Sequence, residues 1–229
     1  MPVQTRGGAS ASPSTGTHRQ RLVHTWPLWL GVITLFGLWL SPLVALSRSA
    51  FSAHMILHLG IVTVASPLIA IGLMRSRLDI GFLSPGLKSA LAASAFDMFV
   101  VWAWHAPSLH EAAARHTPVF ILQQASFLAA GLLVWTISFA GRSKANAALG
   151  AFAMLTTFMH MTMLGVLLSV APDLIYAPDV CVGAFGFARL DDQRFGGVLM
   201  AVFGGLPYMI GGLALVARVL SEETAGERP

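Results

Sequence analysis

Charged residues are scarce in this chain. Only 10% of its 229 residues are Asp, Glu, Lys or Arg, whereas about 25% is usual for a soluble domain. At the same time 55% of the residues are apolar, and the mean hydropathy is +0.72. The chain therefore lacks the polar surface needed to cover itself in water. This excludes a disordered protein, a nucleic-acid-binding protein and an ordinary cytosolic enzyme.

Cysteine is almost absent as well. The single Cys181 excludes an intrachain disulfide framework and any metal site built from a pair of cysteines. The alternation of apolar and polar residues typical of a membrane β-barrel is also missing. What remains is a chain of long apolar runs.

These runs predict membrane-spanning helices, because about 20 apolar residues at about 1.5 Å each cross a hydrocarbon core about 30 Å thick. Six stretches qualify: Pro27–Leu46, Ser52–Met74, Leu87–Trp104, Val119–Ala140, Ala147–Val170 and Phe195–Leu220. We expect an all-α fold, a polytopic membrane bundle of about six helices over residues 27–220. Residues 1–26 are predicted to be a disordered cytoplasmic tail, and residues 221–229 a short cytoplasmic one.

The basic residues predict the orientation. With the N-terminus inside, ten of the 14 Lys and Arg residues fall on the cytoplasmic side, and Arg48, Arg115, Arg189 and Arg194 fall outside. Both termini are then cytoplasmic in a bacterial inner membrane. The two longer loops, residues 106–118 and 171–194, lie on the outer side, which is therefore the expected working face.

Polar residues kept inside apolar segments are the informative ones, since they are costly in lipid. His54 and His58 stand four residues apart at the outer start of the second span. This spacing puts two imidazoles on one helix face, about 5–6 Å apart at Cβ, and suits chelation of one metal ion. The alternative is a pair of interfacial histidines bonded to loop carbonyls.

Depth along the helices groups further candidates into one outer-leaflet layer. At about 1.5 Å per residue, His58, Gln124, Met98 and Met163 all lie roughly 8–10 Å below the outer ends of their spans. His105 ends the third span at the outer surface. Imidazole and thioether groups are ligands for a soft or borderline metal, copper above all. Methionine is also a common gap-filler in apolar packing, which is the competing interpretation.

His160 and Asp97 lie deeper than this layer. His160 is about one turn below Met163, near the midplane, where it could serve as a ligand or bond a neighbouring helix. Asp97 is the carboxylate placed well inside a span, roughly 11 Å below Trp104. It must be protonated, paired or facing water. It could orient a metal-bound histidine as an outer acceptor or merely bond a neighbouring helix.

The last span carries structural signals. Asp191 and Asp192 precede it and are expected to cap its own N-terminus. The small residues Gly197, Ala201 and Gly205 are expected to allow close helix contact.

Together these motifs resemble the polytopic CtaG-type cytochrome c oxidase assembly factors. The resemblance runs from about Trp26 to Leu220 and rests on the order and spacing of a few motifs. These are Phe51–Leu59 with Ser66-Pro67-Leu68 and Gly72, Trp104-His105-Ala106-Pro107 with Leu109 and Glu111-Ala112-Ala113, Phe127–Trp135, and Asp192-Gln193 with Gly197, Met200 and the glycine-rich final helix.

The resemblance implies a non-catalytic inner-membrane factor for maturation of the haem–copper oxidase, acting at its copper centres. It carries over His54, His58 and His105 as functional positions. The family tends to have a histidine in the fourth span where this chain has Gln124, a poorer partner for Cu(I).

The resemblance together with the depth argument predicts the metal residues His54, His58, His105, His160 and Met163, of which His160 and Met163 rest on depth alone. Asp97 and Gln124 are the predicted outer partners, and copper is the predicted metal. The expected partners are oxidase subunits, other assembly factors and the lipid bilayer, and no nucleic acid. Two alternatives stay open. A haem-binding membrane redox protein needs two histidines at matching depth. A metal or proton transporter would use Asp97, His160 and the helix-breaking Pro42 and Pro67.

Overall fold

A computed structural model describes residues 16–76, 86–141 and 143–226, with side chains for the part from residue 25 to residue 221. In these ranges the chain is helical and has no strand. The elements are α1 (Gly16–Trp39), α2 (Leu43–Leu46), α3 (Phe51–Leu59), π-helix η1 (Gly60–Ala65), α4 (Ser66–Arg75), α5 (Leu87–His105), α6 (Pro107–Arg115), α7 (Thr117–Ala140), α8 (Lys144–Ser169), α9 (Arg189–Leu199), π-helix η3 (Met200–Gly204) and α10 (Leu206–Gly226).

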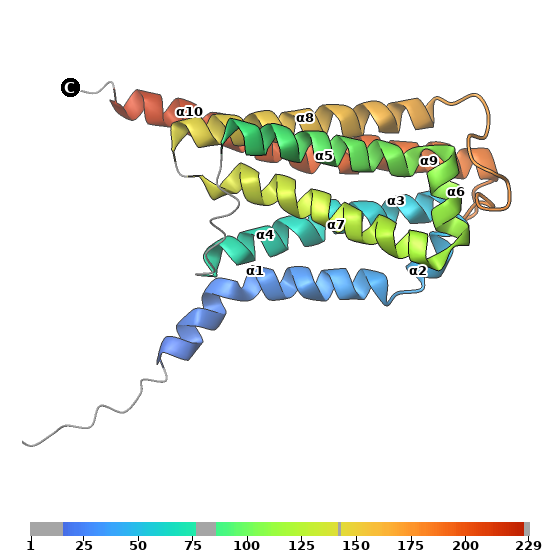
Figure 1. The fold of residues 1–229 in the computed structure, drawn as a ribbon, viewed down its shortest axis with the longest axis horizontal. Helices are drawn as coiled ribbons and strands as arrows, with labels where there is room; N and C mark the ends of the chain where they lie inside the picture. The colour runs from blue at the N-terminus through green and yellow to red at the C-terminus, as the bar shows by residue number, and fades with distance from the viewer. Residues whose placement is uncertain (1–15, 77–85, 142, 227–229) are drawn as a thin grey trace, which may run out of the picture.

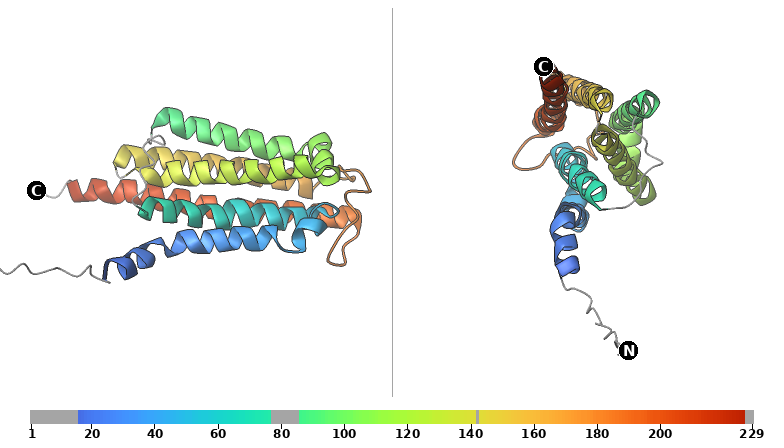
Figure 2. Two further views of the ribbon diagram at one scale, coloured as in Figure 1. Left: turned by 60° about the horizontal axis from the view of Figure 1, so that its bottom comes forward. Right: turned by 90° about the vertical axis from the view of Figure 1, so that its left-hand side faces the viewer.

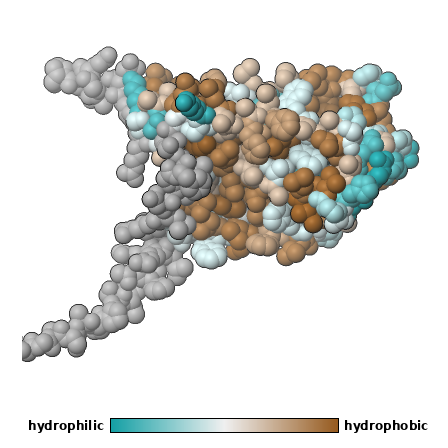
Figure 3. Space-filling view, viewed as in Figure 1, coloured by the Kyte–Doolittle hydropathy of each residue, from teal (hydrophilic) through white to brown (hydrophobic). Residues whose placement is uncertain are grey.

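The long helices run side by side as one bundle (Figures 1 and 2). The short helix α6 lies across one end of it, together with the loop of residues 170–188; we call this the α6 end. Helix α1 begins and α10 finishes at the opposite end (Figure 1). Hydrophilic residues gather at the α6 end, while hydrophobic ones dominate the flank of the bundle (Figure 3). This distribution is typical of a membrane protein.

The predicted polytopic helical bundle is confirmed. Five continuous helical segments in the described ranges are long and apolar enough to cross a membrane: Phe51–Arg75, Leu87–His105, Thr117–Ala140, Lys144–Ser169 and Arg189–Ser221. They match the second to sixth predicted spans to within a few residues, apart from an earlier start of the last one. It begins at Arg189 because α9 already forms before the apolar run starts.

The first predicted span, Pro27–Leu46, is wrong at its C-terminal end, and its helix begins before the apolar run. Helix α1 begins at Gly16, within the segment predicted as a tail, and stops at Trp39. The chain then turns before the separate four-residue helix α2. The turn forms because the Ser41 hydroxyl donates to the carbonyl of Leu38 at 2.8 Å, and because Pro42 cannot continue the helical hydrogen bonds. Residues 1–15 of the predicted tail lie outside the described residues.

Proline also shapes the α6 end. Ala106 precedes Pro107 and takes an extended conformation (φ −66°, ψ 134°), as residues before proline do. Helix α5 therefore ends at His105, and α6 starts with Pro107 after the single linking residue Ala106. The predicted outer loop thus contains a helix. The sharp ending matters for the site, because it leaves the carbonyl of His105 free of helical hydrogen bonds.

Two π-helices interrupt spans at similar places. Each stands just before a proline: η1 precedes Pro67 and η3 precedes Pro207. Proline has no N–H for the helical ladder, so the preceding turn widens. In η1 the carbonyl of Val62 accepts hydrogen bonds from Trp135 Nε1 at 2.9 Å and from the Tyr208 hydroxyl at 3.2 Å. The distorted turn is therefore tied to α7 and α10.

Helices α8 and α9 approach each other through glycine, as the small residues predicted. A Cβ added to Gly197 would lie 2.5 Å from the backbone nitrogen of Ser169, and one added to Gly165 would lie 2.4 Å from that of Ala201. At these distances no side chain larger than the hydrogen atom of glycine fits at either position. The contact packs α9 and η3 against α8.

Candidate metal centre

Three histidines from two spans meet near the α6 end of the bundle. His54 and His58 lie on one face of α3, and His105 is the last residue of α5. One nitrogen from each ring can be chosen so that all three lie within 4.8 Å of one another. All three side chains are buried, with at most 5% of their surface exposed. The spacing of four residues and the proline-terminated helix therefore bring the imidazoles to one point.

The hydrogen bonds of these rings leave their nitrogens available. His105 Nδ1 lies 2.6 Å from the carbonyl oxygen of Val101, so Nδ1 carries the hydrogen and Nε2 presents a lone pair. His105 Nε2, His54 Nε2 and both nitrogens of His58 have no hydrogen-bond partner among the described residues. Buried polar atoms are nearly always paired. A metal ion would pair these nitrogens, and a ring fixed by a backbone carbonyl is the usual arrangement of a histidine ligand.

Aromatic rings enclose the cluster. Phe127 of α7 stacks on His58 with ring centroids 4.0 Å apart and planes at 12°. On the other side His110 of α6 packs against His54 at 4.8 Å, and Tyr176 packs against His110 at 4.3 Å. Phe51 stacks on Tyr176 at 4.8 Å. These contacts exclude water and fix the ring planes.

His110 is a buried neighbour of the three-histidine cluster rather than a member of it. Burial, followed by the nearby His105, lowers the pKa of His110 to about 3. The ring is therefore neutral at physiological pH and adds no positive charge that would repel a cation. Its Nδ1 has no hydrogen-bond partner among the described residues.

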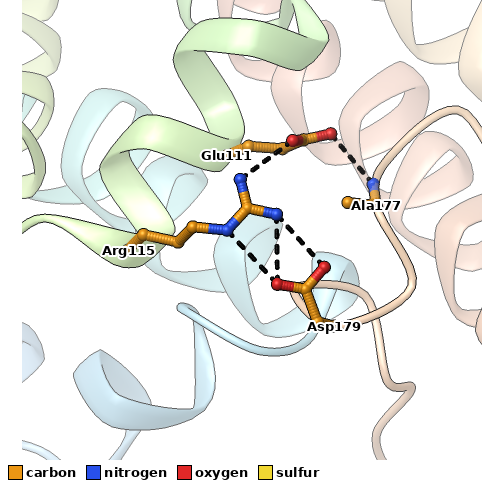
Figure 4. Close-up of polar contacts among 4 residues, drawn as sticks. All are labelled: Glu111, Arg115, Ala177 and Asp179. Atoms are coloured by element: carbon orange, nitrogen blue, oxygen red, sulfur yellow. Dashed lines mark hydrogen bonds and ion pairs between the residues drawn. The ribbon is translucent and has the colours of Figure 1, made fainter.

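The loop of residues 170–188 closes the site at the α6 end. The Tyr176 hydroxyl donates to the carbonyl of His105 at 3.0 Å, and burial raises the pKa of Tyr176, so the hydroxyl keeps its proton. Figure 4 shows how the loop is tied to α6: Arg115 bonds Asp179 through two nitrogens at 3.0–3.2 Å and Glu111 at 3.0 Å. Glu111 also accepts from the backbone N–H of Ala177 at 3.0 Å (Figure 4).

Two residues of α9 fix the surroundings of the site: Asp192 bonds the start of α3, and Gln193 bonds the loop of residues 170–188. Asp192 is fully buried and accepts from the backbone N–H groups of Phe51 and Ser52, at 2.8 and 3.2 Å, and from the Ser52 hydroxyl. It therefore caps α3, the histidine-bearing helix. The sequence had predicted a cap for its own helix, where the structure shows no side-chain cap bond. Gln193 accepts from the N–H of Ile175, next to Tyr176, at 2.8 Å.

His160 and Asp97 form a separate pair. His160 Nε2 on α8 lies 3.0 Å from Asp97 Oδ2 on α5, and both side chains are buried. No ring contact joins His160 to the three-histidine cluster within the described part of the chain. The structure thus brings together two residues that the sequence singled out separately, His160 and Asp97, and they lie apart from the three-histidine cluster.

The remaining predicted residues do not meet the cluster. Met163 is 52% exposed and Met98 is 45% exposed, so both face the outside of the bundle. Gln124 is buried, but its Nε2 donates to Gln123 at 3.3 Å rather than to a histidine. Its side chain lines a cavity of about 260 Å³ beside Trp39. The depth argument took account of position along each helix but not of the face on which each side chain lies.

Sequence reasoning missed the enclosing residues. Phe127, His110 and Tyr176 come from three different elements, and only tertiary contact shows that they surround one point. The signal for His110 was present, since it lies five residues after His105 in a helix that Pro107 starts. Cys181 stays outside the site. Burial, followed by the Asp192 carboxylate, raises the pKa of its thiol to about 11, which keeps it protonated.

Comparison with known proteins identifies the family. The sequence pattern of the cytochrome c oxidase caa3 assembly factor family (Caa3_CtaG) matches residues 10–222. The chain belongs to this family. Neither the curated proteins nor the solved structures contain a significant match to it.

Membership of the oxidase assembly factor family covers nearly the whole chain, including every helix that carries the three-histidine cluster. The predicted family is thereby confirmed. Assembly of cytochrome c oxidase by a multi-pass membrane protein is the function that this membership supports, and such a family is not typically catalytic.

Proposed function

We propose that this assembly factor binds copper at His54, His58 and His105 and supports maturation of a copper centre of cytochrome c oxidase. The observation that carries the proposal is the convergence of three buried imidazoles, in which His54 Nε2, His105 Nε2 and both nitrogens of His58 have no hydrogen-bond partner among the described residues. His160 and Met163, which were also predicted as ligands, are left out of this set because they lie elsewhere.

The chemistry of the donor set supports copper. Three neutral imidazoles suit Cu, Zn, Fe and Ni. The family is named for assembly of cytochrome c oxidase, and the sequence resemblance implies action at copper centres of that enzyme, so copper is favoured among these metals. The described residues place no carboxylate among the three rings, so the site carries no negative charge. Such a set favours a singly charged ion over a doubly charged one, since less charge is left buried without compensation. Cu(I) is therefore the proposed form.

The packing disfavours haem in the same place. A haem needs a wide planar space between two axial ligands. Here Phe127 lies flat on His58 at 4.0 Å, and the rings of His58 and His105 have centroids 5.5 Å apart. These contacts fill the space that a macrocycle would occupy.

We further propose that the α6 end faces the outer side of a bacterial inner membrane, as the distribution of basic residues predicts. The site then lies close to the surface on which a copper-binding oxidase subunit or another assembly factor would dock. Closure by the loop of residues 170–188 means that this loop must open for the ion to enter or leave from that side.

The first test is copper binding by the purified full-length protein. We expect one Cu(I) per chain in the wild type. Each of His54→Ala, His58→Ala and His105→Ala is expected to weaken binding by at least about 100-fold. Loss of a residue that only bonds a metal ligand already lowers metal affinity by up to about 100-fold. His116→Ala is the matched control, since His116 is exposed in the same region and should leave binding unchanged.

Two results would overturn the assignment. Unchanged copper in all three variants would place the metal elsewhere. Binding of Zn(II) with no binding of Cu(I) would show that the cluster serves another ion. In cells, the proposal requires an inserted protein and a copper-poor oxidase when His58 or His105 is replaced, whereas normal oxidase copper in a strain lacking the gene would reject it.

A further inference from the structure

The pair of Asp97 and His160 lies deep in the membrane part of the bundle. Asp97 is about 12 Å from the outer end of α5, and His160 about 14 Å from that of α8, at about 1.5 Å per residue. Asp97 has no exposed surface, and His160 has 3%. Their contact joins His160 Nε2 to Asp97 Oδ2 at 3.0 Å, and the Thr157 hydroxyl donates to the same oxygen at 3.3 Å.

The contact does not satisfy all the polar atoms of the pair. Asp97 Oδ1 and His160 Nδ1 have no hydrogen-bond partner among the described residues. The hydroxyl of Ser94, one turn from Asp97 on α5, is unpartnered in the same sense. Buried polar atoms without partners call for a particular explanation, such as a bound ion, a proton or water.

Charge balance points to a proton. A carboxylate beside a neutral imidazole has a net charge of −1, which is costly in a region of low dielectric. One added proton removes that net charge. It either neutralises the carboxyl group or converts the imidazole into an imidazolium that pairs with the carboxylate. In either form the added proton lies between Asp97 Oδ2 and His160 Nε2, or on one of the two unpartnered atoms, Asp97 Oδ1 and His160 Nδ1.

The neighbouring elements offer little other charge to compensate the pair. Tyr208 of α10 is a titratable residue near Asp97, and its hydroxyl donates to the carbonyl of Val62 rather than to the carboxylate. Helix α7 and π-helix η3 contain no titratable residue. The charged and titratable groups of the other packed helices lie toward the helix ends: His110, Glu111 and Arg115 on α6, Arg189, Asp191, Asp192 and Arg194 on α9, Arg218, Glu222 and Glu223 on α10, and Lys144 and Lys88 at the starts of α8 and α5.

We propose that Asp97 and His160 form an intramembrane proton-binding site, separate from the three-histidine cluster, that takes up and releases one proton. The site sits at the contact of α5 and α8. Since α5 carries His105 at its outer end, the pair lies on a helix that also shapes the candidate metal centre. The proposal does not depend on copper binding.

The test counts protons and locates them in the full-length protein in lipid vesicles. Infrared difference spectra between acidic and alkaline buffer should contain a carboxyl or imidazolium band that is absent from both Asp97→Asn and His160→Gln. Proton uptake over the same range should fall by one per chain in each variant. Asp191→Asn is the matched control, because Asp191 is exposed and should leave that band in place.

Thr157→Val keeps both titratable groups. It therefore tests the proposal even if Asp97→Asn or His160→Gln fails to fold. It removes a hydrogen bond that stabilises the ionised carboxylate, so the midpoint of the band should move to higher pH. A purely structural contact would leave the midpoint unchanged. The proposal is overturned if the folded variants Asp97→Asn and His160→Gln retain the wild-type band and proton uptake, or if Thr157→Val leaves the midpoint in place.

Discussion

The Asp192 carboxylate of α9 accepts a hydrogen bond of 2.8 Å from the backbone N–H of Phe51, the first residue of α3. The same carboxylate accepts from the N–H of Ser52 and from that of Ala184 in the loop of residues 170–188. One buried side chain thus fixes the start of the helix that carries His54 and His58, and also a turn of the loop that covers them. A negative charge at this point further favours the positive end of α3.

Asp192→Asn is expected to destabilise the protein by roughly 1–3 kcal/mol, because an amide cannot replace a carboxylate that accepts several hydrogen bonds in a buried place. The free energy of unfolding in detergent measures the effect. Copper affinity should also fall, since α3 loses its cap. Asp191→Asn, an exposed neighbour, should change neither quantity. Equal stability of the two variants would contradict the capping role.

Tyr176 is expected to control how fast metal leaves the three-histidine cluster. Tyr176→Phe removes the hydrogen bond to the carbonyl of His105 but keeps the stack on Phe51, whereas Tyr176→Ala removes both. Removal of Cu(I) by a soluble chelator should therefore be faster in Tyr176→Phe than in the wild type, and fastest in Tyr176→Ala. Equal rates in all three proteins would show that the ion leaves by another route.

The ion pair of Arg115 and Asp179 should make closure of the loop sensitive to acid. Arg115 lowers the pKa of Asp179 below its ordinary value near 3.8. A lowered pKa in the folded state means that the stabilisation is complete above the ordinary value and is lost as pH falls through the lowered one. Both groups are exposed, so the effect is small and weakened by salt.

The measurement is protection of a protease site or a spin label in residues 170–188 as a function of pH. Protection in the wild type should fall at strongly acidic pH. Asp179→Asn should show the low-pH level of protection throughout, because the ion pair is already absent. A wild-type profile that coincides with that of the variant would show that the ion pair does not hold the loop.

Much of the fold can be predicted from the sequence, because a helix that crosses a lipid bilayer must be apolar over a fixed length. Five of six spans were predicted to within a few residues at nearly every end, since apolar length alone decides them. Pro42 ended the first span early, a local effect that an apolar count overlooks. The four-residue spacing of His54 and His58 likewise needs only helix geometry, and the sharp end of α5 at His105 follows from Pro107.

The rest depended on contacts between distant segments. Depth along a helix is readable from the sequence, but the direction of a side chain around the bundle is not, which is why Met163 proved half-exposed while His110 proved buried. Asp192 looked like the cap of its own helix and instead caps α3, 140 residues earlier in the chain at Ser52. Such a partner becomes visible only when the packing of α3 on α9 is known.

Close backbone contact between α8 and α9 makes a last prediction about stability. Gly197→Ala places a Cβ 2.5 Å from the backbone nitrogen of Ser169 and 2.8 Å from the carbonyl oxygen of Gly165, and neither atom belongs to a flexible side chain that could move aside. We expect a loss of about 1–3 kcal/mol, as for other overpacked sites, measured as the free energy of unfolding in detergent. Gly37→Ala is the matched control in α1, where an added Cβ meets nothing within 4 Å, and it should be neutral or stabilising by up to about 1 kcal/mol. If Gly197→Ala were as stable as Gly37→Ala, α8 and α9 would have to stand farther apart than the structure places them.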